Sequence, residues 1–359
     1  MNETQRIFRN TAAQSAPVIT TFLFSFILAP IMLSRLGLAQ FGVWAVTGAL
    51  AQYARLLDFG VTRSIARFVA LFDARGDRGA IEETVGIGVA AATAITLLTI
   101  VAAIVAAPLV AEVLGILSTA EMRVVLVCSG GISASYLFSA VLSAVPVGLR
   151  RMGPPNAAET AGNVVNFVAS LVALALSTKL APYALANLGA AVIGFLITLG
   201  AFVYVWSAPF LRRPTISRGR EILSFGVKSQ LVTLAQLVNA QTDKLIIAAM
   251  LGARTAGAYE IGNRVVQGTL SLGVLSLSAL IPAATAYLVK RGKGVIAEYL
   301  GRYTVRSLAI AFPLFGTICV SAPYLLTGWL GEIPAESVQI IALLSVSYAV
   351  SMTTGVAMT

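Results

Sequence analysis

The stretch LGLAQFGVW at residues 36–44 recurs in degenerate form as LGARTAGAY at residues 251–259. In both copies four residues separate Leu-Gly from a second glycine, and an aromatic residue stands two positions further on. Matched positions are 215 residues apart, as Gly37 and Gly252 illustrate. Each copy lies in a short break between two long apolar segments, where glycine permits a tight turn and close helix contact. The pattern predicts two copies of one unit about 215 residues long.

The composition is that of a membrane protein. Of the 359 residues, 58% are hydrophobic and 11% are charged, and the mean hydropathy is +0.87. A soluble domain carries about 25% charged residues. Apolar runs of about 20 residues recur along the chain, the length that a hydrocarbon core of ~30 Å requires. We therefore expect an all-α, polytopic membrane protein.

Residue usage excludes several kinds of chemistry. The chain has no histidine, which removes histidine proton relays, histidine-ligated metals and serine–histidine catalysis. The two cysteines, Cys128 and Cys319, lie isolated in apolar segments, so neither a disulfide framework nor a metal site is expected. We expect no cofactor and no enzymatic activity.

Hydropathy predicts ten membrane helices joined by short loops. The expected ranges are 11–35, 41–62, 81–106, 122–146, 157–178, 182–206, 224–250, 255–287, 305–326 and 336–358. The longest breaks are polar stretches at 63–80, 207–220 and 288–304 and a more apolar one at 107–121. No stretch is suited to form a separate soluble domain.

Lysine and arginine are divided unequally between the two sets of loops. The N-terminus and the loops after the second, fourth, sixth and eighth helices hold thirteen: Arg6, Arg9, Arg75, Arg78, Arg150, Arg151, Arg212, Arg213, Arg218, Arg220, Lys290, Arg291 and Lys293. The opposite loops hold four: Arg35, Arg123, Lys179 and Arg254. The positive-inside rule then places the N-terminus in the cytoplasm. Much of the net charge of +10 thus reflects topology, and we expect no nucleic-acid partner.

The repeat predicts two lobes, 1–213 and 214–359. Both lobes begin in the cytoplasm, which makes them parallel repeats of the kind that build two-lobed transporters around a central cavity. The first lobe has six helices and ends at the basic linker Pro209–Arg220. Thr359 is the repeat equivalent of Ala144, in the fourth helix, so the second lobe is expected to lack its last two helices.

Short motifs beside the repeated stretch point to a family. The first half continues with Leu57-Asp58-Phe59-Gly60, Arg63 and Arg67, and the second half has Asp243-Lys244-Leu245-Ile246-Ile247 just before residues 251–259. These runs resemble the openings of the two halves of bacterial polysaccharide-export proteins. Those proteins are the oligosaccharide flippases of the multidrug/oligosaccharidyl-lipid/polysaccharide exporter superfamily.

The resemblance covers essentially the whole chain. It implies a V-shaped pair of six-helix lobes around a central cavity, and transport of an undecaprenyl-diphosphate-linked oligosaccharide across the bacterial inner membrane. Membrane lipid and other proteins of polysaccharide assembly are the further partners that it suggests. This chain departs from the pattern in its missing last two helices. It also has no arginine or lysine between Arg9 and Arg35, where some flippases carry basic residues.

The eighth predicted helix carries the strongest candidate site. Its polar residues follow spacings of three, four and seven and share one face: Glu260, Asn263, Arg264, Gln267, Ser271 and Ser278. Arg264 lies ~15 Å along the helix at 1.5 Å per residue, near the bilayer midplane. A charge at that depth should face a wet cavity or a partner. Arginine suits a diphosphate because it bonds phosphate oxygens bidentately, although a structural Glu260–Arg264 pair also explains the spacing.

Two further polar stripes lie on the seventh and fifth predicted helices. The first consists of Lys228, Ser229, Gln236, Asn239 and Asp243, and the second of Glu159, Asn163, Asn166 and Ser170. Either stripe can bind substrate or hold neighbouring helices together by hydrogen bonds. With the fifth helix expected to begin at residue 157, Glu159 falls in its first turn, where a carboxylate complements the helix dipole.

The remaining candidates are charged. Arg55 is expected to help bind the diphosphate from the first lobe, and Asp58 lies three residues further on, beside a possible helix break at Gly60. Arg302 and Arg306 lie at the start of the ninth helix and can form a phosphate entry site or serve topology alone. If transport is driven by protons or sodium, a deep carboxylate must take part, and Asp58, Asp243 and Glu260 are the candidates.

The leading functional hypothesis is a flippase for lipid-linked oligosaccharide. A cation-coupled drug exporter of the same superfamily is the first alternative. Asp58, Asp243 and Glu260 favour it, and the deep basic residues Arg55, Lys228 and Arg264 disfavour it. A membrane glycan polymerase or ligase is the second alternative. Such an enzyme needs a catalytic extracytoplasmic loop, and the longest one here, 107–121, is largely apolar.

Overall fold

The computed structural model describes residues 3–206, 215–278, 296–331 and 335–354. Over these residues the chain is helical and contains no β-strand. Its internal contacts divide it into two compact units, Met1–Ala256 and Gly257–Thr359.

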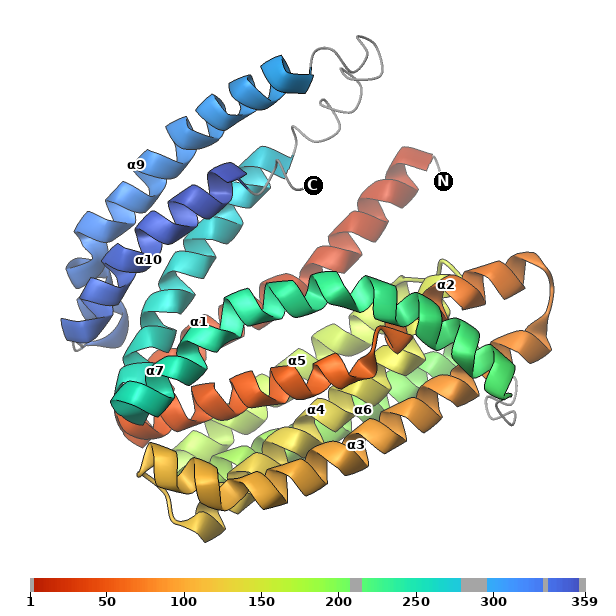
Figure 1. Ribbon diagram of the computed structural model, residues 1–359, viewed down its shortest axis with the longest axis horizontal. Coiled ribbons are helices and arrows are strands. Elements are labelled where there is room, and N and C mark those ends of the chain that lie inside the picture. Colours follow the sequence, from red (N-terminus) through yellow and green to blue (C-terminus); the bar gives the residue numbers. More distant parts are fainter. Residues whose placement is uncertain (1–2, 207–214, 279–295, 332–334, 355–359) are drawn as a thin grey trace. The chain divides into compact units, whose positions relative to one another are not determined.

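The helices follow the predicted order but with different boundaries (Figure 1). They are α1 (Glu3–Arg55), the short 3-10 helix η1 (Leu56–Asp58), α2 (Val61–Ala74), α3 (Arg78–Leu114), α4 (Thr119–Gly148), α5 (Gly153–Leu176), α6 (Leu180–Val205), α7 (Ile216–Ser278), α9 (Ile296–Leu330) and α10 (Ala335–Thr354). Within the described residues, seven helical segments are long and apolar enough to cross a membrane: Ala16–Ala54, Arg78–Leu114, Thr119–Gly148, Gly153–Leu176, Leu180–Val205, Thr304–Leu330 and Ala335–Thr353. This bears out an all-α membrane protein.

The two repeated stretches adopt the same backbone conformation. Each of α1 and α7 joins two of the predicted helices across a single non-helical residue. That residue is Gly37 in α1 (φ 76°, ψ 163°) and Gly252 in α7 (φ 84°, ψ 172°). This region of backbone space is essentially restricted to glycine. The equivalence predicted from the 215-residue offset therefore extends to the dihedral angles of the turn.

The predicted helix 41–62 and loop 63–80 are both wrong in detail. The helix ends at Arg55, and Gly60 adopts a left-handed conformation (φ 71°) that breaks the chain direction. The expected loop is instead the amphipathic helix α2, which buries one apolar face. The buried residues are Val61, Ser64, Ile65, Phe68, Val69 and Phe72. Arginines on the other face give the stretch a polar composition, which hid its helical period.

The predicted loop at 107–121 is also shorter than expected. α3 continues through Pro108 to Leu114, where Gly115 ends it in a left-handed conformation (φ 62°). α4 then starts with a capping box, in which Ser118 and Glu121 satisfy each other's backbone N–H groups. Proline is tolerated within membrane helices, so α3 does not end at Pro108.

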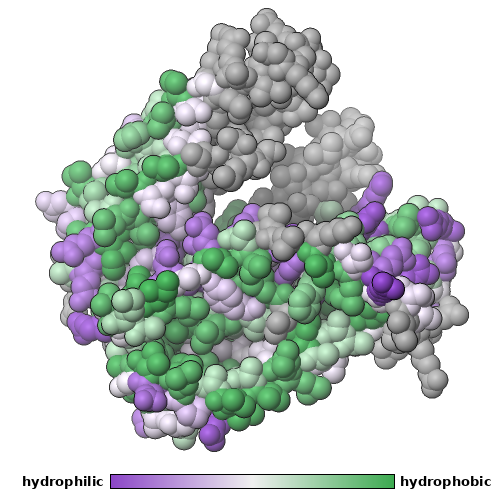
Figure 2. Space-filling model, viewed as in Figure 1, coloured by the Kyte–Doolittle hydropathy of each residue, from purple (hydrophilic) through white to green (hydrophobic). Residues whose placement is uncertain are grey.

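The first unit is a bundle in which α4 and α6 are central. α3 and α6 pack on α4, while α5 packs on α6 and α1 packs on α5 (Figure 1). Its main apolar core lies where α2, α3, α4 and α6 meet, and Ile222 of α7 contributes to it. Many large apolar side chains remain on the surface (Figure 2), as expected for helices that face lipid rather than water.

Candidate functional site

The first unit contains two adjoining polar hollows. The α4–α5–α6 pocket is lined by Ser135, Tyr136, Ser139, Ala140, Ser143, Ala158, Glu159, Gly162, Asn163, Asn166, Ala190, Ala191, Gly194, Phe195 and Thr198. The α1–α4–α7 pocket is lined by Gln52, Leu56, Asp58, Gly60, Thr62, Arg63, Tyr136, Leu137, Ala140, Gln230, Thr233 and Leu237. Their volumes are about 270 and 360 Å³. Tyr136 and Ala140 border both pockets, so the two hollows meet at this edge of α4.

Small residues create the α4–α5–α6 pocket. Gly162 and Gly194 face each other, and a Cβ on either would lie 3.5 Å from the Cα of the other. α5 and α6 are therefore in close contact, and alanines on both helices leave space beside α4. The polar groups of α4 and α5 border that space.

The asparagines of the α5 stripe hold helices together. Asn163 Nδ2 donates to the Pro17 carbonyl and to the hydroxyls of Thr20 and Thr21, at 2.9–3.1 Å, which ties α5 to α1. Asn166 Nδ2 donates to Asn187 Oδ1 of α6 at 2.9 Å. Ser170 Oγ donates to the same oxygen at 3.3 Å. These contacts are the interhelical hydrogen bonds that the sequence left as an alternative.

Glu159 needs a different explanation from the predicted one. α5 begins at Gly153, four residues before the expected start, with Pro154 and Pro155 in its first positions. Glu159 is therefore beyond the first turn, where the helix dipole has largely lost its effect. Within the described part of the chain it has neither a hydrogen-bond nor an ion-pair partner, and its side chain borders the pocket.

In the α1–α4–α7 pocket, Asp58 contacts the first turn of α2. Its Oδ2 accepts a hydrogen bond from the Thr62 backbone N–H at 3.3 Å. Arg63 lines the same hollow. A carboxylate and a guanidinium thus border one cavity. Gln230 of α7 also lines it, and its Nε2 donates to the Leu56 carbonyl of η1 at 3.0 Å.

The polar stripe of the eighth predicted helix lies in the second unit, in the second half of α7. Arg264 Nε donates to Glu260 Oε1 at 2.9 Å, and the two side chains are 25% and 12% exposed. Asn263 is buried and accepts a hydrogen bond from the Tyr348 hydroxyl at 3.0 Å. Gln267 Nε2 donates to the same Tyr348 oxygen at 3.2 Å. The Glu260–Arg264 pair that the spacing allowed is present, and substrate binding by these residues stays a prediction.

The other sequence candidates do not gather at one place that the structure describes. Gln236, Asn239, Asp243 and Arg306 are exposed on their helices. Arg55, Lys228 and Arg302 lie in helices, but their side chains fall outside the described residues, as does Ser278. Their roles in binding substrate or ions stay predictions.

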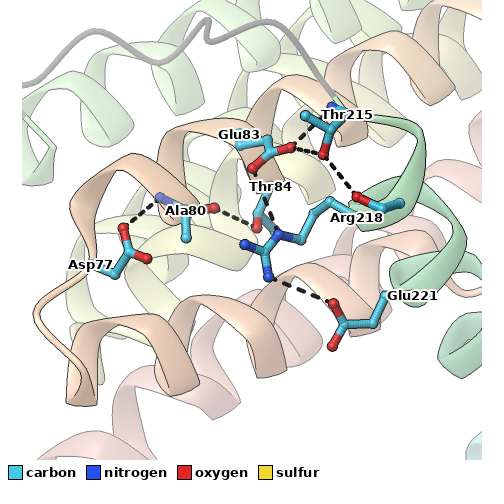
Figure 3. Close-up of polar contacts among 8 residues, drawn as sticks. Asp77, Ala80, Glu83, Thr84, Thr215, Arg218 and Glu221 are labelled. Atoms are coloured by element: carbon cyan, nitrogen blue, oxygen red, sulfur yellow. Dashed lines mark hydrogen bonds and ion pairs between the residues drawn. The ribbon is translucent and has the colours of Figure 1, made fainter.

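A polar cluster joins the start of α3 to the start of α7 (Figure 3). Glu83 accepts hydrogen bonds from both the backbone N–H and the hydroxyl of Thr215, and Arg218 Nε lies 3.6 Å from its other oxygen. The Arg218 guanidinium also lies over the Phe72 ring and 3.6 Å from Glu221. These contacts tie the start of α7 to α2 and α3 within the first unit.

The sequence contained a signal for the pocket that was not used. Ser135, Ser139 and Ser143 are spaced by four residues, which places them on one face of α4. Isolated serines in an apolar helix normally bond to their own backbone, as Ser135 does to the Gly131 carbonyl at 3.0 Å. These serines line a pocket only because α5 lies opposite this face of α4.

Comparisons with known proteins agree on the fold. Residues 7–288 match the family model described as "Polysaccharide biosynthesis protein". Among curated proteins, no sequence matches this chain. An inward-facing structure of a MATE-family multidrug resistance transporter of the MOP superfamily is 14% identical, with 95% of this chain and 80% of that chain covered and a TM-score of 0.66.

A MOP-superfamily transporter from Pyrococcus furiosus, described as having a binding pocket of reversed polarity, is 16% identical. The match covers 97% of this chain and 81% of that transporter, with a TM-score of 0.58. At these identities the likeness shows the fold. The family model spans most of the chain, which therefore belongs to the polysaccharide biosynthesis protein family, and the chain has the fold of transporters of the MOP superfamily.

Proposed function

We propose that this transporter flips a polyprenyl-diphosphate-linked oligosaccharide from the cytoplasmic to the outer face of the bacterial inner membrane, for the assembly of a surface polysaccharide. The observation that carries the proposal is the match of residues 7–288 to a polysaccharide biosynthesis family. Membrane lipid and other proteins of polysaccharide assembly are the further partners that it implies. The N-terminus lies in the cytoplasm in this proposal.

Transport proceeds by alternating access between two lobes, 1–213 and 214–359. The diphosphate needs cationic partners with planar donor geometry, which arginine provides. Arg264 and Arg55 supply them, and Arg63 in the α1–α4–α7 pocket adds a third guanidinium. Lys228, Gln236, Asn239, Asn263 and Gln267 contribute polar contacts, and Arg302 and Arg306 serve substrate entry.

The alternative is a cation-coupled exporter of small molecules. It is favoured by the fold, which is shared with multidrug transporters, and by the carboxylates Asp58 and Glu159 in the two hollows. An acidic cavity attracts cationic substrates. Catalysis of glycan polymerisation or ligation has no comparable support.

Deletion of the gene, followed by mass analysis of lipid-linked glycans, separates the two proposals. A flippase defect should cause one lipid-linked oligosaccharide to accumulate, and the wild-type gene should reverse this. An unchanged lipid-linked pool, together with increased sensitivity to cationic dyes, would replace the flippase proposal by the exporter.

Ion coupling is a separate proposal, and Asp58 offers its sharpest test. Asp58→Asn keeps a side-chain acceptor for the Thr62 N–H, whereas Asp58→Ala also loses this hydrogen bond, at a typical cost of about 1 kcal/mol. If Asp58 carries the ion, Asp58→Asn should fold normally and lose its response to an imposed proton or sodium gradient. Asp243→Asn and Glu260→Gln complete the set, and unchanged gradient dependence in all three variants would reject coupling through these carboxylates.

A further inference from the structure

We propose that the α4–α5–α6 pocket binds a sugar of the transported glycan and that Glu159 is its main recognition group. This rests on the proposed flippase function. The pocket combines a carboxylate, hydroxyl groups and two aromatic rings, those of Tyr136 and Phe195. Carboxylates and hydroxyls bond sugar hydroxyls, and a ring supplies an apolar face for a sugar ring.

Glu159 carries the inference because its exposed carboxylate borders the pocket and has no partner among the described residues. A charged group within the membrane is costly and normally has a partner or faces water. Among the described residues Glu159 has no partner, and its place in α5 is beyond the reach of the helix dipole. Ser139 and Ser143 also border the pocket without a partner in the described part of the chain. Three polar groups therefore face the hollow and remain available to a ligand.

The charge of the lining decides which part of the substrate fits. The described residues that form the pocket include no lysine or arginine, and their one charge is that of Glu159. A diphosphate would be repelled here, whereas a neutral sugar is accepted. The neighbouring α1–α4–α7 pocket contains Arg63 and meets this pocket at Tyr136 and Ala140. In the substrate, the diphosphate is joined directly to the first sugar. The two adjoining pockets can therefore hold the sugar in one and the phosphate in the other.

The size of the pocket limits the ligand. Its volume of about 270 Å³ lies just below the range of typical ligand sites, which is roughly 300–1,000 Å³. It can hold one or two sugar rings rather than a long oligosaccharide. The inferred ligand is therefore the sugar attached to the diphosphate.

The test measures binding of two probes to the purified full chain: farnesyl diphosphate carrying one glucose, and farnesyl diphosphate alone. The wild-type protein should prefer the glycosylated probe. Glu159→Gln should weaken binding of the glycosylated probe about five- to tenfold, because the amide keeps an acceptor but loses the charge that strengthens the hydrogen bond, and should leave the bare diphosphate unaffected. Glu112→Gln, an exposed carboxylate at the far end of α3, is the matched control and should change neither affinity.

A labelling experiment keeps the inference testable if Glu159→Gln folds poorly. In a protein with Cys128→Ala and Cys319→Ala, Ser143→Cys should react with a maleimide and be protected by the glycosylated probe alone. Equal protection by both probes, or unchanged affinity in folded Glu159→Gln, would overturn the sugar site and leave the flippase proposal standing. Glu159-dependent binding of tetraphenylphosphonium without glycan binding would assign the pocket to cations. Wild-type protein that binds neither lipid diphosphate would overturn both proposals.

Discussion

Arg264 forms an ion pair within its helix and is also the residue that we propose binds the substrate diphosphate. It is ion-paired to Glu260 at 2.9 Å, yet a quarter of its side chain remains exposed. A guanidinium has five N–H donors, and the bond to Glu260 is made by Nε. The pair therefore explains the presence of charge in this helix without excluding an anionic ligand.

Substitutions of Arg264 separate the two roles. Arg264→Ala should weaken binding of a lipid diphosphate about ten- to a hundredfold, because a charge-assisted hydrogen bond contributes roughly 1.5–3 kcal/mol. Arg264→Lys should be impaired less, since it keeps the charge but loses the bidentate fork. Binding and flux of reconstituted protein provide the measurement, and Arg213→Ala in the linker should behave as wild type.

The double variant Glu260→Gln/Arg264→Ala is the decisive control. It removes the carboxylate that Arg264→Ala alone would leave without its arginine. If transport returns to the wild-type rate in the double variant, Arg264 serves only to neutralise Glu260. Continued impairment of a well-folded double variant supports contact with the diphosphate.

Residue spacing predicted local contacts well and distant contacts poorly. Four residues between Glu260 and Arg264 put both on one helix face, and their ion pair follows from geometry alone. The bonds of Asn263 and Gln267 to Tyr348 depend on how α10 packs against α7, 81–85 residues away in sequence. Glu159 was misjudged for a related reason: its environment depends on the start of α5, and a shift of four residues removed the dipole explanation.

At the scale of elements, the two glycine turns adopt a backbone conformation that other residues rarely take. Gly37→Ala and Gly252→Ala should each destabilise the protein by about 1–3 kcal/mol, because alanine is strained in this backbone region. Thermal unfolding of the purified protein measures the effect. The added methyl groups meet no neighbour within 4 Å, so the loss is due to the backbone alone.

Gly200→Ala is the matched control for these turns. Gly200 lies within α6 in a helical conformation, and its added Cβ would also meet nothing within 4 Å. Alanine there should leave stability unchanged or raise it by up to about 1 kcal/mol. Equal behaviour of all three variants would show that the turns are not under glycine-specific constraint.

The first half of α7 forms a continuous seam with α1, η1, α2 and α3. Besides the Glu83 cluster, its contacts are Arg67 over the Phe225 ring at 4.0 Å, Ser64 to the Ile222 carbonyl at 3.0 Å, Gln230 to the Leu56 carbonyl at 3.0 Å, Tyr53 to Thr242 at 2.6 Å and Gln241 to Gln52 at 3.3 Å.

Gly226 permits the closest approach, since a Cβ there would clash with the Phe59 carbonyl. Gly226→Ala should therefore loosen the seam, and Gly219→Ala, in open space on the same helix, should not.

Cross-linking between cysteines at Gln52 and Gln241 measures this seam in a background free of native cysteine. Its yield should fall in Gly226→Ala and stay unchanged in Gly219→Ala. With lobes of 1–213 and 214–359, alternating access requires the seam to open, so the cross-linked transporter should stop. If transport continues after complete cross-linking, the moving lobe would begin at the Gly252 turn and not at the linker.

At the scale of the whole molecule, the sequence predicted the repeat because two turns with the same rare backbone conformation require glycine at the same offset. The helices of each repeat were located by hydropathy, which registers apolar length but not an amphipathic connection, and so α2 was missed. The pockets could not be located from sequence, because each is formed by faces of three or more helices. What the repeat does predict, beyond the turns, is that both halves enter the membrane from the same side.

Labelling of single cysteines tests this directly. Arg35 and Arg254 flank the Gly37 and Gly252 turns and are exposed, and parallel repeats place both on the outer face. In intact cells, a membrane-impermeant maleimide should label Arg35→Cys and Arg254→Cys, whereas Arg75→Cys should react only after lysis. Both test substitutions remove outward positive charge, so the positive-inside rule gives them no tendency to invert the protein. Labelling of only one of the two turns from outside would mean that the halves are inverted, and labelling of Arg75→Cys alone would place the N-terminus outside.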